Sequence, residues 1–332
     1  MKSAGLVFTH EHMELARHYR DQPPFAAAWT AFENLAENES IRNDSLMISA
    51  YRAIRARLFN SSDSAEQAIA GLIALPTSVE AGSPTDAARR VFGHAQALAC
   101  LRDFASPVQW LTICEGWVPG WEEAQAQLSS IPHERAWSTL LTLCRGVLLE
   151  DQTLLDSGAE TFRGLVSMIH AHGFITGVVE GKDGGSLTRS LQLVQALILA
   201  AEVGAHAGLD LWGYEQRGVS VLTAALYPLY YYFYPESWPW EAAVDPRKLT
   251  RRAQRALAAQ VPDDQVLEAN RALYARYGSF LELINRRTGR PVQAVTLVLD
   301  ELRPIVDLFG GGPVTLTHAA PPLPKRKGLF GR

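Results

Sequence analysis

The sequence predicts an all-α protein, and three features of the chain support this. Apolar residues recur at helical spacing along most of the 332 residues, and there are no convincing runs that alternate between apolar and polar residues. Prolines and glycines separate the periodic segments, and Ser, Asp or Pro stands where helices usually begin. The connections are mostly short, as in domains built from consecutive antiparallel helices.

The N-terminal part of the chain is predicted to hold amphipathic helices separated by prolines. Phe25, Trp29 and Phe32 fall on one face of such a helix, and Asp44 can cap the start of a later one. Pro119 and Gly120 are predicted to turn the chain. The expected helices are Glu11–Arg20, Phe25–Glu37, Asp44–Leu58, Ser62–Leu72, Asp86–Phe104, Pro107–Trp117 and Trp121–Leu128.

The C-terminal part is predicted to hold longer helices. These are His133–Glu150, Asp151–His172, Leu187–His206, Val219–Tyr234, Asp245–Ala259, Asp263–Arg287 and Pro291–Leu308. No linker interrupts the chain before Gly310, so residues 1–309 are expected to form one domain. The glycines at 310–312 and the proline-rich end predict a flexible tail over residues 310–332.

About a dozen helices joined by short turns can form a solenoid, a bundle or a closed ring of hairpins. The chain lacks the fixed period of the common solenoid repeats. A ring of hairpins, the (α/α) toroid, is consistent with the helix count, although the count does not prove it.

The amino-acid composition argues against nucleic acids, membranes and metal ions as binding partners of the protein. The hydrophobic content is 47%, the charged content 20% and the formal net charge −4, which describes a globular protein without a basic field for nucleic acid. No segment has the roughly 18 uninterrupted apolar residues expected of a membrane span. The three cysteines lack CxxC spacing, and no HExxH pattern occurs, so we expect neither a metal site nor a cofactor.

We expect no signal peptide in the N-terminal residues, because they carry one positive charge and too short an apolar run. We therefore expect a cytoplasmic protein, or a secreted or periplasmic one if a leader has been removed. The oligomeric state is not predicted.

The loop Glu180–Ser186 and the helix after it hold the first candidate site residues. Arg189 and Gln192 lie one helical turn apart, so both can point into one cleft, where an arginine suits a bidentate contact with a carboxylate. The loop lacks the pattern of a nucleotide P-loop. A plain glycine-rich connection and a surface arginine are the alternatives.

Aromatic residues supply the other candidates. His133 and Trp137 open a helix, and the run from Tyr227 to Trp240 includes Tyr230 and Trp238. Aromatic rings stack on the apolar faces of sugars, although core packing accounts for most rings in such a run. We expect Trp137, Tyr230, Trp238 and Gln192 to contact a substrate.

The order of these features resembles the alginate lyase superfamily. The shared pattern is carried by His133 and Trp137 at a helix start, Asp151 and Gly173, the Asp183-Gly184 loop, Arg189, the run Gly208–Trp212 and the ending Trp238-Pro-Trp240. The resemblance is clearest over residues 86–245. It implies an (α/α) toroid, an incomplete barrel of antiparallel helical hairpins, that acts on uronate-containing polysaccharides by β-elimination.

The resemblance also implies roles for single residues. In this family an Arg, an Asn and a His neutralise the uronate carboxylate, and a Tyr or His moves the protons. Arg189 matches the Arg and His133 matches the His. The Asn would fall at Ile131 or Pro132 and the Tyr at Ala196, so both are missing, and Tyr214 is the candidate replacement acid.

The sequence therefore predicts an alginate lyase-like protein that acts on or binds an acidic polysaccharide or oligosaccharide, with His133, Arg189 and Tyr214 as catalytic candidates. The alternative is a catalytically inactive toroid that serves as a glycan- or protein-binding module. A glycosidase on a related toroid is a third interpretation, with Glu180 and Asp183 as the nearest pair of carboxylates.

Overall fold

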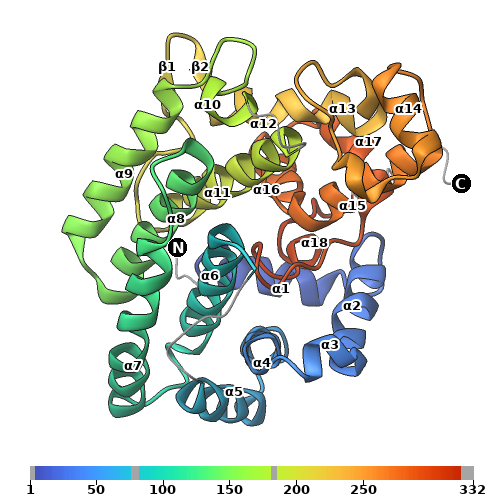
Figure 1. The fold of residues 1–332 in the computed structure, drawn as a ribbon. Coiled ribbons are helices and arrows are strands. Elements are labelled where there is room, and N and C mark those ends of the chain that lie inside the picture. Colours follow the sequence, from blue (N-terminus) through green and yellow to red (C-terminus); the bar gives the residue numbers. More distant parts are fainter. Residues whose placement is uncertain (1–3, 76–81, 181–184, 323–332) are drawn as a thin grey trace, which may run out of the picture.

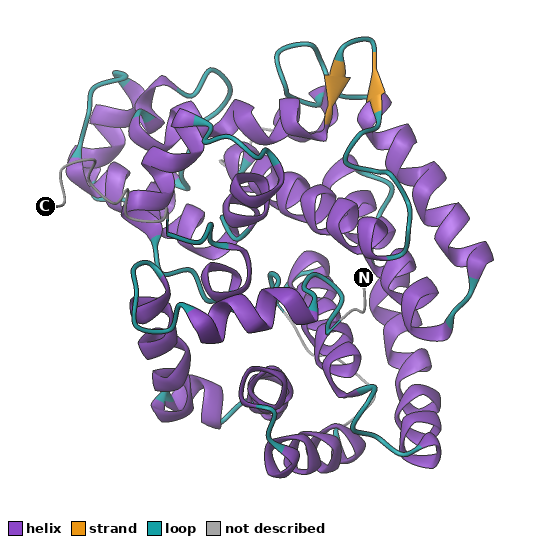
Figure 2. Cartoon of the chain, turned by 180° about the vertical axis from the view of Figure 1, so that it is seen from behind, coloured by secondary structure: helices purple, strands orange, loops and turns teal. Residues whose placement is uncertain are grey.

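The computed structural model describes residues 4–75, 82–180 and 185–322, and these ranges are almost wholly helical (Figures 1 and 2). The only strands in them are β1 (Glu215–Gln216) and β2 (Val219–Ser220), which pair antiparallel. The predicted all-α class is confirmed. None of the helices in these ranges is long and apolar enough to cross a membrane.

Four long helices form the inner layer of the molecule. Helix α11 (Ser186–His206) packs on α8 (Pro132–Leu149), α8 packs on α6 (Pro84–Leu101), and α6 packs on α4 (Ser45–Phe59). Almost every side chain of α11 is buried, because other elements cover it on all sides. A helix apolar on nearly every face is what such a central position requires.

Short helices from the two ends of the chain close the ring. Helix α4 contacts α1 (His10–His18), α1 contacts α18 (Val314–His318), and α18 contacts α16 (Phe280–Arg287), which returns to α11. The closed ring thus joins the first and last helices of the described chain (Figure 1).

The next helix along the chain covers each of three inner helices. Helix α5 (Ser62–Ala74) packs on α4, α7 (Pro107–Ala126) on α6, and α9 (Gln152–Ser167) on α8. In Figure 1 these three helices lie outside their partners. An inner and an outer helix per hairpin is the architecture of the expected (α/α) toroid, which is confirmed.

The remaining elements fill the periphery, mostly on the C-terminal side (Figure 1). Their bounds are α2 (Phe25–Asn34), η1 (Leu35–Glu37), α3 (Glu39–Arg42), α10 (Thr176–Val179), α12 (Val221–Leu226), η2 (Tyr227–Leu229), α13 (Tyr230–Phe233), η3 (Pro235–Ser237), η4 (Pro246–Lys248), α14 (Arg251–Ala258), α15 (Asp264–Tyr277) and α17 (Gln293–Leu302).

Several helix boundaries differ from the prediction, and the expected helix Val219–Tyr234 is divided into β2, α12, η2 and α13. Helix α7 continues through Pro119, where a turn was expected. Pro119 and Glu115, four residues earlier, are both exposed, so water can reach the carbonyl that loses its hydrogen bond. The single helix expected over 263–287 is divided at Gly278 into α15 and α16.

The prediction of a flexible tail from residue 310 is wrong for the part that the structure describes. Gly311 and Gly312 have φ angles of +115° and +89°, which L-residues with a side chain rarely adopt. The Gly312 amide donates to the Asp307 carbonyl at 2.7 Å, and α18 then enters the core with all five residues buried. These glycines therefore form a tight turn that directs the chain inward. Residues 323–332 lie outside the described ranges.

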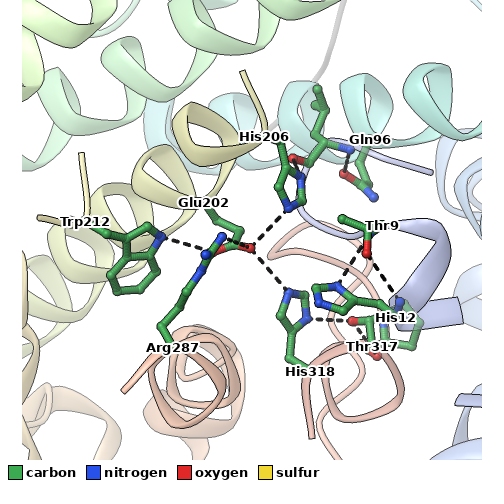
Figure 3. A network of polar contacts seen from close by, with 11 residues as sticks. Thr9, His12, Gln96, Glu202, His206, Trp212, Arg287, Thr317 and His318 are labelled. Atoms are coloured by element: carbon green, nitrogen blue, oxygen red, sulfur yellow. Dashed lines mark hydrogen bonds and ion pairs between the residues drawn. The ribbon is translucent and has the colours of Figure 1, made fainter. Parts of the chain in front are cut away.

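A buried polar cluster links the elements that close the ring (Figure 3). Glu202 of α11 receives two hydrogen bonds of 2.9 Å from Arg287 of α16 and lies 3.3 Å from Nε2 of His206. His318 of α18 lies 4.0 Å away on the other side and packs its ring against that of His12 in α1. The cluster thus connects α11 to α16, α18 and α1.

Candidate functional site

The N-terminal ends of three inner helices meet at a pocket of about 660 Å³. Ser83, Pro84 and Thr85 line it at the start of α6, and His133 and Glu134 at the start of α8. At the start of α11 it is lined by Gly185, Thr188, Arg189 and Gln192. Helix α15 and the segment 244–248 form the opposite wall. The repeated hairpin explains this convergence, because it returns each inner helix to the same end of the ring.

The electrostatics of this pocket favour an anion. The first turn of a helix presents backbone N–H groups and a partial positive charge, and three such turns converge here. Neither α8 nor α11 has a side-chain cap on these N–H groups. Among the described residues that line the pocket, four charged side chains are arginine or lysine and two are carboxylates: Arg189, Arg247, Lys248 and Arg276 against Glu134 and Asp245.

Three of the predicted site residues lie together in this pocket. His133, Arg189 and Gln192 all line it, the first from α8 and the other two from successive turns of α11. Arg189 donates from Nε to the carbonyl oxygen of Val178 at 2.9 Å, which fixes its guanidinium against helix α10. Arg189 and Gln192 therefore face the same pocket, as their helical spacing predicts.

Tyr277 also lines this pocket, although the sequence does not identify it as a site residue. Its ring is 4% exposed, and its hydroxyl accepts a hydrogen bond from Nε2 of Gln192 at 3.2 Å. No acceptor for the Tyr277 O–H lies among the described residues, so this proton is available to a bound ligand. Tyr277 lies inside the predicted helix Asp263–Arg287 without any motif, and only the packing of α15 against α11 brings it to this pocket.

A buried network supports Tyr277 from below. The guanidinium of Arg89 lies 5.0 Å from the centre of the Tyr277 ring, within the range of a cation–π contact. Arg89 also donates to Asp307 at 2.7 Å and to the carbonyl of Arg276 at 2.9 Å. Because that carbonyl immediately precedes Tyr277, Arg89 holds both the ring and its backbone.

The other predicted residues do not line this pocket. Trp137 is fully buried in the core, where its ring packs against Phe92. Tyr230 is 58% exposed on the surface and stacks on Tyr234. Trp137 is not accessible to a substrate, because core packing covers its whole side chain, and Tyr230 lies outside the pocket of Arg189.

Tyr214 and Trp238 also lie outside the pocket. The Tyr214 hydroxyl is 3.4 Å from the side chain of Gln216 in β1, and its ring lies against Arg163 of α9. Trp238 is buried, donates to Ser186 Oγ at 2.8 Å and lines a neighbouring pocket instead. Tyr214 is therefore not placed to act with Arg189.

The remaining predictions about the site concern metals and the glycine loop. Among the described residues, no group of three or more His, Cys, Asp or Glu side chains could hold a metal ion. Of the predicted loop Glu180–Ser186, residues 181–184 lie outside the described ranges, so the suggested pair of Glu180 and Asp183 lies partly outside them too.

Comparison with known proteins gives likeness in structure only. No protein-family model matches the chain, and no curated protein matches it in sequence.

Solved structures match over most of the chain. Alginate lyase A1-III from Sphingomonas species A1 matches with a TM-score of 0.63 and 17% identity, covering 84% of this chain and 76% of that one. A histidine-to-alanine variant of that enzyme complexed with a tetrasaccharide matches with a TM-score of 0.62 over 85% and 79%. An alginate lyase from Bacteroides ovatus matches with a TM-score of 0.66 and 10% identity over 95% and 99%. The chain therefore has the (α/α) toroid fold of the alginate lyases.

Proposed function

We propose that the pocket around Arg189 binds a uronate unit of an acidic polysaccharide and cleaves the adjoining glycosidic bond by β-elimination. The observation that carries this proposal is the convergence of three helix N-termini with Arg189, His133 and the hydroxyl of Tyr277. The solved complex of an alginate lyase of the same fold with a tetrasaccharide supports an oligosaccharide as the ligand.

Arg189 and His133 are the groups for the uronate carboxylate. A guanidinium forms paired hydrogen bonds with a carboxylate, and helix N-termini add favourable potential at the same place. Withdrawing charge from the carboxylate makes the neighbouring C5 proton more acidic. This is the electrostatic stabilisation that an elimination from a uronate needs, because negative charge develops beside the carboxylate.

Tyr277 is the group for proton transfer. In the elimination the phenolate form of Tyr277 takes the C5 proton, a double bond forms between C4 and C5, and the bond from C4 to the glycosidic oxygen breaks. The phenol so formed then donates that proton to the leaving oxygen, which restores the phenolate. The hydrogen bond from Gln192 fixes the position of the Tyr277 oxygen and stabilises its negative charge.

Tyr277 replaces the tyrosine that the family resemblance places at position 196. Ala196 is fully buried and does not line the pocket, whereas Tyr277 approaches Gln192, four residues before Ala196, from helix α15. We infer that the hydroxyl is supplied by a different helix.

The second candidate is a glycan-binding toroid without catalytic activity. Pro132, buried in the first turn of α8, stands where the resemblance places an asparagine, and proline has no side-chain hydrogen bond to offer. In that case the pocket holds the same anionic sugar but does not cleave it. Binding and cleavage must therefore be measured separately.

The test uses alginate, polygalacturonate and a glucuronate-containing glycosaminoglycan. Cleavage is followed by the ultraviolet absorbance of the unsaturated uronate that it produces. Binding is measured by calorimetry with saturated oligosaccharides of the same polymers. We expect one polymer to give an absorbance increase, and the Arg189→Ala variant to bind its oligosaccharide about tenfold or more weakly. The matched control is Arg163→Ala, at an arginine outside the pocket.

Three results separate the candidates. An absorbance increase that Arg189→Ala abolishes supports the lyase. Binding that depends on Arg189 without any absorbance increase supports the inactive binding module. Binding to none of these polymers, or binding that Arg189→Ala leaves unchanged, contradicts both.

A further inference from the structure

A second pocket, of about 440 Å³, lies on the other side of the segment that bounds the first. Residues 242, 243 and 246 of that segment face this second pocket, whereas residues 244, 245, 247 and 248 face the pocket of Arg189. Helix η3 and the C-terminal end of α14 complete its wall. Nothing in the proposed function uses this second pocket.

Two carboxylates in the second pocket have no protein partner. Glu236 is only 9% exposed, and no hydrogen bond or ion pair reaches its carboxylate from the described residues. Oε2 of Glu241 is buried and also lacks a hydrogen-bond partner there. These two carboxylates face one pocket and have no partner among the described residues, so their negative charge is available to a positively charged ligand.

The pocket itself offers no such cation. Its described lining holds the two glutamates but no arginine, lysine or histidine. This is the opposite of the pocket of Arg189, where cationic side chains outnumber carboxylates. A cation that pairs with these glutamates would therefore come from a ligand and not from the described wall of the pocket.

Two tryptophans indicate that the cation is organic. Trp238 and Trp240 line the pocket, and their indole N–H groups are already donated, to Ser186 Oγ and to the Tyr227 hydroxyl, both at 2.8 Å. These N–H groups are therefore not available to a ligand, and the two side chains contribute aromatic carbon to the pocket wall. Tryptophan is the side chain whose ring attracts cations best. The rest of the wall includes Leu257, which suits an apolar stem.

We propose that this second pocket binds an organic cation, an ammonium or guanidinium group on a short apolar stem, between Trp238, Trp240 and the carboxylates of Glu236 and Glu241. The site is independent of the uronate site, since the two pockets share no lining residue and carry opposite charge. The same chemistry occurs in a free alkylamine and in a lysine or arginine side chain of a peptide.

The first test compares probes on the unaltered protein. Calorimetry, with tryptophan fluorescence as a second readout, is run with n-butylammonium chloride, n-butanol and glucose. We expect saturable binding of butylammonium and none of butanol or glucose. Equal binding of butanol would show that the charge is irrelevant, and binding of glucose in place of butylammonium would show a neutral sugar site; either overturns the proposal. Because this comparison needs no substitution, it does not depend on any variant folding.

The second test uses variants. Glu236→Gln and Glu241→Gln should each weaken butylammonium binding about tenfold, since each removes one charged hydrogen-bond acceptor. Glu160→Gln, on the exposed face of α9, is the matched control and should bind as the parent does, as should Arg189→Ala. Unchanged affinity in both pocket variants contradicts the proposal. Because the Arg189→Ala variant should still bind butylammonium, a failure of the proposed uronate site can be distinguished from a failure of this second site.

A peptide arm distinguishes the sources of the cation. A blocked tripeptide with a central lysine is titrated beside butylammonium. If the peptide binds, and the Glu236→Gln substitution weakens this binding, the site is assigned to a basic side chain of a protein partner. Binding of butylammonium alone assigns it to a free amine, and binding of neither overturns the site.

Discussion

At the scale of single residues, the pocket combines side chains of two kinds. Arg189 and His133 belong to helix starts that the glycine-rich loop and Pro132 make visible in the sequence. Tyr277 is positioned by the packing of α15 against α11. Gln192 donates a hydrogen bond to its hydroxyl, and the guanidinium of Arg89 lies over its ring. This gives the tyrosine a position but leaves its O–H for a ligand.

Replacing Tyr277 with phenylalanine tests that role. If the tyrosine transfers protons, Tyr277→Phe lowers kcat on the cleaved polymer by about 10²–10⁴-fold and changes KM little. The melting temperature should fall only slightly, because one hydrogen bond of about 1 kcal/mol is lost. Initial rates from ultraviolet absorbance and a thermal melt provide the measurements. Tyr214→Phe is the control, and equal rates in the two variants would contradict the assignment.

The sequence could predict part of this site but not all of it. Local periodicity places Arg189 and Gln192 on one helical stripe, and both line the pocket. It could not place Tyr277, because no local pattern reports which distant helix closes a ring. It also misplaced Trp137, Tyr230 and Tyr214, since aromatic composition does not distinguish core, surface and cleft.

At the scale of elements, close contacts decide where helices and turns meet. Gly93 lies in α6, and a Cβ built on it would stand 2.3 Å from Cδ1 of Phe309 and 2.9 Å from the carbonyl oxygen of Leu308. The turn at residues 307–312 therefore presses directly against the backbone of α6. The glycines at 310–312 predict flexibility when only the sequence is considered. In the structure, Gly311 and Gly312 permit a tight turn with positive φ angles, and Gly93 permits that turn to pack closely against α6.

Gly93→Ala should destabilise the protein by about 1–3 kcal/mol, because the added methyl group overpacks this contact. The effect runs against helix propensity, which favours alanine by about 1 kcal/mol. Gly116→Ala is the matched control in α7, where a Cβ would meet nothing within 4 Å. Urea unfolding compares the two. Equal midpoints would show that the turn does not pack on α6 as described.

The cluster around Glu202 fastens α11 to α16. Glu202→Gln leaves Arg287 without its carboxylate, and breaking a buried pair of this kind costs about 3 kcal/mol or more. Glu150→Gln, which breaks the exposed pair with Arg102, should cost less than about 1 kcal/mol. Chemical denaturation of both variants gives the comparison. A smaller loss in the Glu202 variant than in the Glu150 variant would contradict the role of the cluster.

The same cluster predicts a dependence of stability on pH. Burial lowers the pKa of His318 to about 4, and burial together with the neighbouring His318 lowers the pKa of His12 to about 3. Although burial opposes it, hydrogen bonds from His206 and Arg287 hold the pKa of Glu202 below its usual value. In the unfolded chain all three groups take up protons at higher pH than in the folded state.

Stability is therefore full above about pH 7 and is lost as the pH falls, first through protonation of unfolded histidines near pH 6.5 and then of the glutamate. His318 alone should contribute a loss of about 1 kcal/mol per pH unit below 6. Urea midpoints measured from pH 7.5 to 4.5 should fall steadily, and less steeply in His318→Asn. A midpoint that stays constant over this range would rule out the coupling.

At the scale of the whole molecule, the ring is completed by its two ends. Helices α1 and α18 stand between α4 and α16, and without them the inner layer has an open gap. Amphipathic patterns were sufficient to predict the all-α class, whereas the ring of hairpins followed only from the family resemblance. They were insufficient for α18, whose five residues follow a glycine turn and are too few to show a period.

A chain that ends at Phe309 tests this closure. Removing α18 exposes Val314 and Leu316, which are fully buried, together with the apolar surface they cover. Each buried side chain of this kind contributes about 1.5–3 kcal/mol, so we expect the shortened protein to lose most of its stability. Circular dichroism melts provide the measurement. A cooperative melt at the temperature of the full chain would restore the flexible-tail interpretation.

The claim on which the proposed function depends is that the pocket of Arg189 holds a uronate carboxylate. The most direct measurement is a crystal structure of the Tyr277→Phe variant with the tetrasaccharide of whichever polyuronate the protein binds. We expect one carboxylate within hydrogen-bond distance of Arg189, and the neighbouring glycosidic oxygen close to residue 277. A tetrasaccharide bound elsewhere, with no carboxylate at Arg189, would contradict the account.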